Sequence, residues 1–83
     1  MTPIGLAKTE EELAERATRF LKAELKRADM TYDALADKLR KHGFPNETRD
    51  SIKSKLKRGT FAATFLLACL AAMELEGIRL EDV

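Results

Sequence analysis

The residues of this chain with the clearest chemical potential are basic and lie close together in the sequence. Residues 38–58 carry eight of the fifteen Lys and Arg residues and only two acidic residues, a net charge of +6; the net charge is −2 before this segment and −3 after it. Concentrated positive charge attracts polyanions locally, although the whole chain has a net charge of only +1. A solvated basic helix without a ligand is the alternative. The basic residues are Lys38, Arg40, Lys41, Arg49, Lys53, Lys55, Lys57 and Arg58.

Other residue types that support chemistry are isolated. The single cysteine, Cys69, and the single histidine, His42, do not form a zinc-ligand set, and one cysteine cannot form an internal disulfide. Cys69 lies among Leu and Ala residues, which favours a core position over a role as a nucleophile. The acidic residues form no catalytic pair, and the glycines form no phosphate-binding loop. We therefore expect no enzyme activity, no cofactor, no metal site and no small-molecule substrate.

The length of 83 residues allows one small domain with a modest core. We expect residues 1–8 to be a flexible lead-in and residues 9–83 to form the domain. The N-terminus lacks the apolar stretch of a signal peptide, and the longest apolar stretch, residues 61–73, is too short to cross a bilayer. These features predict a cytoplasmic protein without a membrane partner.

Apolar spacing predicts four helices, and the first two are well delimited. Thr9 begins a Thr-Glu-Glu-Glu capping box, after which apolar residues recur every three or four positions, so we expect a helix over residues 10–28. Thr31 is a candidate N-cap for a second helix over residues 32–42. Gly43 then stands where a left-handed C-cap residue belongs.

A third helix, mostly exposed, is predicted over residues 48–58, with Gly59 ending it. Its only large apolar residues, Ile52 and Leu56, lie one turn apart, which allows one narrow seam against the rest of the domain. The sequence does not decide which of three consecutive residues, Asn46, Glu47 or Thr48, is its N-cap.

The fourth predicted helix, residues 61–74 with Thr60 as its cap, has no polar face. An apolar surface all round indicates burial on all sides, within the domain or in a dimer interface. The tail, residues 76–83, alternates apolar and polar residues, a weak signal for a short strand that would pair across a dimer or pack down. A homodimer is therefore expected, and the residues assigned to its surface, or to that of another partner, are Phe65, Leu66, Ile78 and Leu80.

The third helix is the candidate for reading DNA. At about 100° per residue, the direction opposite to the Ile52–Leu56 seam is occupied by hydroxyl, cationic and carboxylate side chains, the chemistry that distinguishes base edges in the major groove. The residues assigned to base reading are Asp50, Lys53, Ser54 and Lys57. Those assigned to phosphates, from this helix and the end of the second, are Arg49, Lys55, Arg58, Lys38, Arg40 and Lys41.

Two segments resemble a known family. The run Met30-Thr31-Tyr32-Asp33-Ala34-Leu35-Ala36-Asp37-Lys38-Leu39 resembles the second helix of lambda-repressor-like (Xre-type) helix-turn-helix domains, and Leu56-Lys57-Arg58-Gly59 is similar to the end of their recognition helix. The Lys-Arg-Gly-Thr-Phe-Ala-Ala-Thr-Phe-Leu-Leu run resembles, more closely, a group of short bacterial domains of unknown function related to that superfamily. The similarity extends over roughly residues 12–75. One departure is the connection between the helices, which is longer than the usual turn of three or four residues.

The resemblance implies an all-α bundle of four to five helices, with the short C-terminal strand as an addition. It also implies phosphate contacts at Thr31 and Tyr32, and sequence-specific binding of double-stranded DNA by a small transcriptional regulator. One alternative is a protein-interaction module, an adaptor or antitoxin-like partner, that binds through residues 61–74 and the tail. RNA binding by the same basic face is a second alternative, which the scarcity of exposed aromatic residues disfavours.

Overall fold

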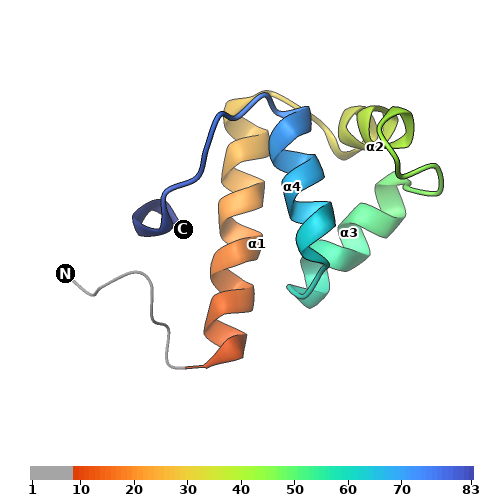
Figure 1. Ribbon diagram of the computed structural model, residues 1–83. Coiled ribbons are helices and arrows are strands. Elements are labelled where there is room, and N and C mark those ends of the chain that lie inside the picture. The colour runs from red at the N-terminus through yellow and green to blue at the C-terminus, as the bar shows by residue number, and fades with distance from the viewer. Residues whose placement is uncertain (1–8) are drawn as a thin grey trace.

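Four α-helices and one short 3-10 helix form the described part of the chain (Figure 1). The computed structural model describes residues 9–83, so the predicted lead-in at residues 1–8 lies outside the described residues. The all-α prediction is confirmed, and the described residues contain no strand. The helices are α1 (Glu10–Arg27), α2 (Tyr32–Lys41), α3 (Arg49–Arg58) and α4 (Ala63–Ala72), and the 3-10 helix is Leu80–Asp82.

Threonine side chains cap the first three helices. The hydroxyl oxygens of Thr9, Thr31 and Thr48 each accept a hydrogen bond of 3.1 Å from the amide three residues on, which satisfies a donor that has no partner within the helix. Thr48 also donates its own amide to the Ser51 hydroxyl at 2.8 Å, completing a capping box. The open choice of N-cap for the third helix is therefore settled in favour of Thr48.

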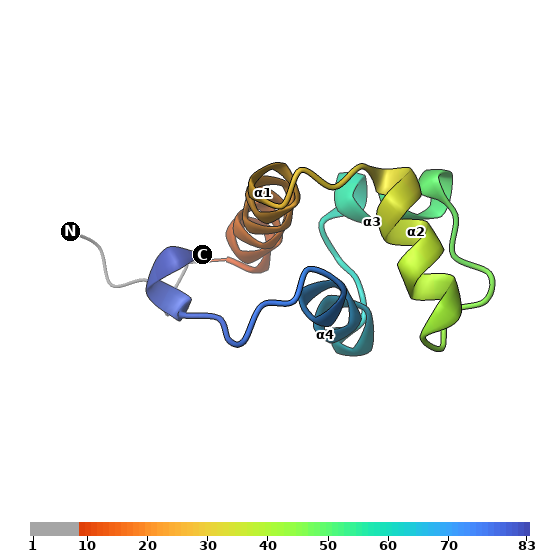
Figure 2. The same ribbon diagram turned by 90° about the horizontal axis from the view of Figure 1, so that it is seen from above.

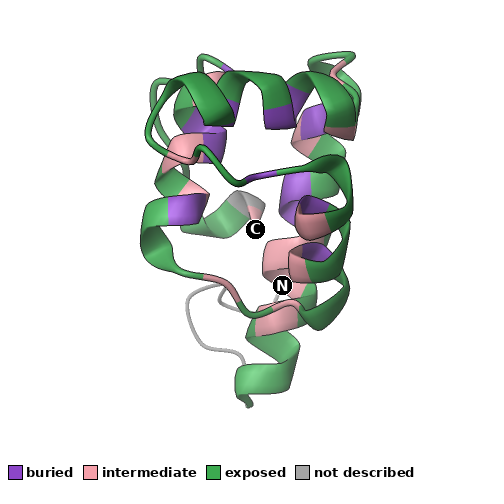
Figure 3. Cartoon of the chain, turned by 90° about the vertical axis from the view of Figure 1, so that its right-hand side faces the viewer, coloured by how far each residue is buried: buried purple, intermediate pink, exposed green. Residues whose placement is uncertain are grey.

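The helices enclose one core, and α2 links its two sides. Helix α2 packs against both α3 and α4, and α1 packs against α3. Figure 2 shows α1 and α3 on one side of the bundle and α4 on the other, with α2 running from the side of α3 to the side of α4. In Figure 3 the buried residues face the interior between these layers. The buried core residues are Phe20, Leu21, Leu25, Leu35, Ala36, Leu39, Ile52, Leu56, Phe65, Cys69, Leu70 and Met73.

Two predictions about the C-terminal part are wrong. The tail forms no strand; it runs without regular structure to the 3-10 helix, because an all-helical bundle offers it no strand partner. Helix α4 is shorter than predicted, and its N-cap is Ala62, without a side-chain hydrogen bond, rather than Thr60. Burial of α4 on all sides is also not found within one chain, since Leu67 is 64% exposed.

Gly59 ends α3 and allows α1 to approach it closely. Its φ of 75° lies in the left-handed region, where a side chain is costly. A Cβ atom built on Gly59 would lie 2.9 Å from the Cβ of Ala14 and 3.1 Å from the Ala14 carbonyl oxygen in α1. Gly43, with a φ of 101°, is also left-handed, but a Cβ atom there meets nothing within 4 Å. Both the left-handed φ and the close contact with Ala14 therefore favour glycine at position 59, whereas at position 43 only the left-handed φ does.

This difference predicts unequal costs for two alanine substitutions. Gly43→Ala should reduce the free energy of unfolding by about 1–2 kcal/mol, the strain of a left-handed L-residue. Gly59→Ala should cost roughly 1–3 kcal/mol more, because α1 must also move. Urea unfolding followed by circular dichroism measures both values, and equal losses would show that the approach of α1 to α3 does not restrict residue 59.

Candidate nucleic-acid interface

The face of α3 that points away from the core carries the residues assigned to base reading. Ile52 and Leu56 are 0% and 2% exposed and fix the helix to the bundle. Each of the four residues Asp50, Lys53, Ser54 and Lys57 is exposed. The sequence periodicity therefore placed the solvent face of α3 correctly, and the structure brings these four side chains together along it.

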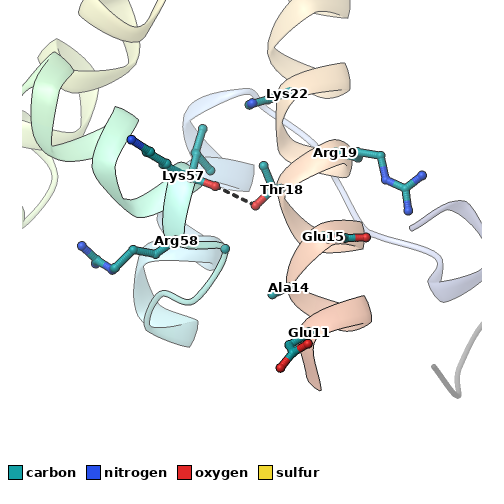
Figure 4. Close-up of a pocket in the computed structure, with 10 residues that line it drawn as sticks. Glu11, Ala14, Glu15, Thr18, Arg19, Lys22, Lys57 and Arg58 are labelled. Carbon is teal, nitrogen blue, oxygen red and sulfur yellow. Dashed lines mark hydrogen bonds between the residues drawn. The ribbon is translucent and has the colours of Figure 1, made fainter. Parts of the chain in front are cut away.

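Helix α1 holds the C-terminal end of α3 in place. The Thr18 hydroxyl donates a hydrogen bond of 2.9 Å to the Leu56 carbonyl oxygen, one of the last carbonyls of α3 (Figure 4). An open groove of about 700 Å³ lies between the two helices. Figure 4 shows Lys57 and Arg58 extending from α3 away from α1.

Lys22 is a candidate contact that the sequence analysis missed. It lines the same groove as Lys57 and Arg58, and in Figure 4 it lies with Ala14 and Thr18 on the side of α1 that faces α3. A signal was present in the sequence: Ala14, Thr18 and Lys22 recur every four residues, so they share one helical face next to the apolar stripe. The small residues Ala14 and Thr18 allow α1 to approach α3 closely, and Lys22 follows Thr18 one turn later.

A buried carboxylate connects the turn between α2 and α3 to α3 itself. Glu47 is 5% exposed, and its Oε2 atom accepts hydrogen bonds from the Ser51 hydroxyl and from the Lys55 ammonium, the latter at 2.8 Å. The Glu47 carbonyl oxygen accepts a further bond of 2.8 Å from the Arg40 guanidinium at the end of α2. A buried charge requires such partners, and both partners of this carboxylate come from α3. The bond from Arg40 to the backbone carbonyl ties the same residue to α2, so Glu47 links the two helices.

This arrangement contradicts the assignment of Lys55 to phosphate binding. Its side chain is 28% exposed, its ammonium group binds Glu47, and the same group lies 5.1 Å from the centre of the Phe65 ring in a cation–π contact. A phosphate contact would have to break the pair and leave a buried carboxylate without its cation. Arg40 is likewise engaged with the Glu47 carbonyl, so both residues position the turn.

The basic cluster of the sequence is divided between two sides of the bundle. Lys38 donates a hydrogen bond of 3.1 Å to the Ala72 carbonyl oxygen at the end of α4, and Lys41 lies 3.5 Å from Asp37 on α2. Both lysines line a groove between α2 and α4, on the side of the bundle opposite to α3 (Figure 2). The expectation that they bind the phosphates of the duplex read by α3 therefore does not fit their placement.

The remaining residues assigned to phosphates lie on the α3 side. Arg49 and Arg58 are exposed at the two ends of α3. Thr31 is exposed at the start of α2, where its hydroxyl oxygen accepts from the Ala34 amide, and Tyr32 beside it is half-buried against the core.

The residues assigned to a partner surface differ in how far they are exposed. Phe65 is 1% exposed and contacts Phe44 and Phe61 edge to face, so it belongs to the core and not to a surface. Leu66 is half-buried, whereas Ile78 and Leu80 are 40% and 68% exposed. The apolar run of the sequence did not distinguish the inner from the outer face of α4.

Cys69 is buried next to the Glu47 network, in agreement with its predicted core position. Burial raises the pKa of its thiol from 9.0 to about 12; the negative charge of Glu47 adds to the rise, and Lys55 opposes it. Within residues 9–83, no three His, Cys, Asp or Glu side chains gather as a metal site would need. In the same range no helix is long and apolar enough to cross a membrane.

Comparison with known protein families identifies the family of this chain. The structure and the exposed α3 face define a small all-helical domain with a basic surface, and the family model described as "Domain of unknown function (DUF6471)" matches residues 13–78. The chain therefore belongs to this family, and the match covers α1 from residue 13 onward and all of α2, α3 and α4. No curated protein and no solved structure shows significant similarity to the chain.

Substitution of two lysines of α3 should affect stability very differently. Lys55→Met leaves the Glu47 carboxylate buried without its cation and should reduce the free energy of unfolding by about 3 kcal/mol. Lys53→Met, two residues earlier on the exposed face, should change it by less than about 0.5 kcal/mol. Urea unfolding measures both changes. If Lys55→Met left the free energy of unfolding unchanged, the pair between Lys55 and Glu47 would not hold the turn.

The buried thiol predicts a loss of stability at high pH. Because the folded pKa of Cys69 lies above the value near 9.0, the folded state keeps a proton that the unfolded state loses between pH 9 and about 12. Stability should fall as pH rises through this window, by up to about 1.4 kcal/mol per pH unit from this group. The variant Cys69→Ala should lose less stability than the parent between pH 8 and pH 10.5, although its stability at pH 8 is lower.

A thiol reagent provides an independent test of the same group. At pH 8 the native chain should react with it only as fast as it unfolds, whereas the urea-unfolded chain should react at once. Rapid modification of the native chain would contradict the raised pKa and the burial together.

Proposed function

We propose that this domain binds double-stranded DNA sequence-specifically, as a small transcriptional regulator that inserts α3 into the major groove. The main support for the proposal is the way in which α3 is attached to the rest of the bundle. Its inner residues Ile52 and Leu56 are fully buried, while its outer face presents Lys53, Ser54 and Lys57 to solvent. A helix that reads DNA needs this combination, because the side chains that contact bases must be exposed while the helix itself is held rigidly by the core.

The outer face of α3 has the chemistry that base edges require. Lysine ammonium groups donate to the O6 and N7 atoms of guanine, serine hydroxyls bond to several bases, and Asp50 can accept from the N4 amino group of cytosine. The ten residues of α3 span about 15 Å, and the B-DNA major groove is about 12 Å wide and admits an α-helix.

Phosphate contacts would flank this face on both sides. Arg49 and Arg58 are exposed at its two ends, and Lys22 borders the groove beside Lys57. The start of α2, with Thr31 and Tyr32, lies on the same side of the bundle (Figure 2). The order of helices, with α2 packed across α3, agrees with the resemblance to lambda-repressor-like helix-turn-helix domains noted in the sequence.

The burial of the aromatic residues favours a duplex over single-stranded RNA. Recognition of unpaired bases uses exposed rings for stacking. Phe20 and Phe65 are buried, and Tyr32, Phe44 and Phe61 are all half-buried. No aromatic residue is fully exposed in residues 9–83, which include every aromatic residue of the chain. A DNA-binding role also accords with the cytoplasmic location expected from the sequence.

Selection from random duplexes, followed by alanine substitutions on α3, tests the proposal. Lys53→Ala and Ser54→Ala should relax the preference at single base positions, each at a cost of roughly 1–3 kcal/mol. The affinity should fall steeply with salt, with a log–log slope that decreases by about 0.9 for each phosphate contact removed. Duplex binding that is absent, or insensitive to salt, would instead favour the protein-interaction alternative.

A matched pair of lysines identifies which side of the bundle contacts DNA. Lys57→Ala and Lys41→Ala each remove one exposed positive charge, but Lys57 lines the groove between α1 and α3, whereas Lys41 lines the groove between α2 and α4. Lys57→Ala should weaken binding and Lys41→Ala should leave it nearly unchanged. Equal losses would show that the net charge of the chain, and not the α3 face, determines affinity.

A further inference from the structure

The outer face of α4 combines an exposed apolar side chain with a groove. Leu67 is 64% exposed, and no residue of α4 is charged. Next to it lies a groove of about 360 Å³ between α2 and α4, which Leu39, Ala68, Ala71 and Ala72 line with apolar surface. Covering this leucine and the groove beside it would remove apolar surface from water, which favours association through this face.

The charged residues around this groove are arranged on opposite walls. Lys38, Lys41 and His42 come from the end of α2, whereas Glu74 follows α4. The α2 wall therefore carries two lysines, of which Lys41 is paired with Asp37 of the same helix, and the α4 wall carries one carboxylate, with the apolar floor between them. A surface with this distribution is complementary to itself, because a two-fold axis along the groove places the α2 wall of one copy opposite the α4 wall of the other.

We propose that the chain forms a symmetric dimer through this face, with a second copy of itself as the occupant of the groove. Leu67 of each copy covers the apolar floor of the other, and Lys41 of each copy faces Glu74 of the other. A partner protein of uniform charge would match only one wall, whereas a second copy matches both. Neither Leu67 nor the equally exposed Leu80, at 68%, lines the groove itself. Leu67 lies on α4 one turn before Ala71, which does line it, whereas Leu80 lies in the tail.

The dimer has a consequence for DNA that rests on the proposed function. Helices α3 and α4 lie on opposite sides of the bundle (Figure 2), and the exposed side of each helix faces away from the core. A two-fold axis that lies in the α4 interface reverses the direction perpendicular to that interface, so the two α3 helices, each on the far side of its own copy, point away from each other. Such a dimer holds two separate duplex segments together and does not read two half-sites of one duplex.

Sedimentation velocity without DNA tests the dimer through two leucines of equal exposure. The parent chain should sediment as a dimer at micromolar to millimolar concentrations, Leu67→Glu as a monomer, and Leu80→Glu as a dimer. Circular dichroism should show the same helix content in all three, because both leucines are exposed. A parent chain that is monomeric throughout, or a dimer lost in Leu80→Glu and kept in Leu67→Glu, would overturn the proposal.

Exchange of the two charges tests the pairing across the interface. Lys41→Glu alone and Glu74→Lys alone each place like charges opposite one another and should associate at least tenfold more weakly than the parent. An equimolar mixture of these two variants should recover the dimer, because both charge pairs are then complementary. Failure of the mixture to associate would rule out this pairing between copies.

A capture experiment separates the dimer from its effect on DNA. A surface coated with one duplex should retain a second, labelled duplex in the presence of the parent chain. Leu67→Glu should bind a single duplex with an affinity within about twofold of the parent but retain no second duplex. A parent dimer that binds DNA without retaining the second duplex would refute the bridging arrangement. A dimer that binds no DNA would refute the proposed function and leave the interface standing.

Discussion

The buried carboxylate of Glu47 is the interaction on which the rest of the structure depends. It holds Ser51 and Lys55 of α3 through its side chain and Arg40 of α2 through its carbonyl group. The turn of residues 42–48 contains Gly43 and would otherwise leave the angle between α2 and α3 open. A buried charge is costly unless it is paired, so the carboxylate has to stay beside Ser51 and Lys55 and fixes Glu47 to α3. The Arg40 bond to the Glu47 carbonyl oxygen then restricts the position of α2 relative to α3. The direction of the outer face of α3 follows from that restriction.

Local signals in the sequence were sufficient for much of the fold. Thr9, Thr31 and Gly59 were expected at helix boundaries and are found there, because capping depends on the nearest three or four residues alone. The exposed side of α3 was also predictable, since Ile52 and Leu56 are its only large apolar residues and the helical period fixes what lies opposite them.

What the sequence did not reveal depends on contacts between distant segments. The cations of residues 38–58 look equivalent along the chain, yet Lys55 is bound to a buried carboxylate and Lys38 to the end of α4. Helix α4 contains a single polar residue, the exposed Thr64, and its other residues are all apolar, so the sequence analysis did not separate the buried Phe65 from the exposed Leu67. The small residues of α1 that face Gly59 and Leu56 gave no hydrophobic signal, because their role is to allow close approach.

The path of α2 across the bundle has a consequence for changes in chain length. Its ten residues form a rod of about 15 Å with one end beside α3 and the other beside α4. Inserting or deleting one residue within this rod would rotate Thr31 relative to Lys38 by about 100°, so the two surfaces could not both be kept. The exposed residues 43, 45 and 46 carry no such constraint. Insertions and deletions that accumulate in this region during evolution should therefore fall in the turn, while the helix before it keeps its length.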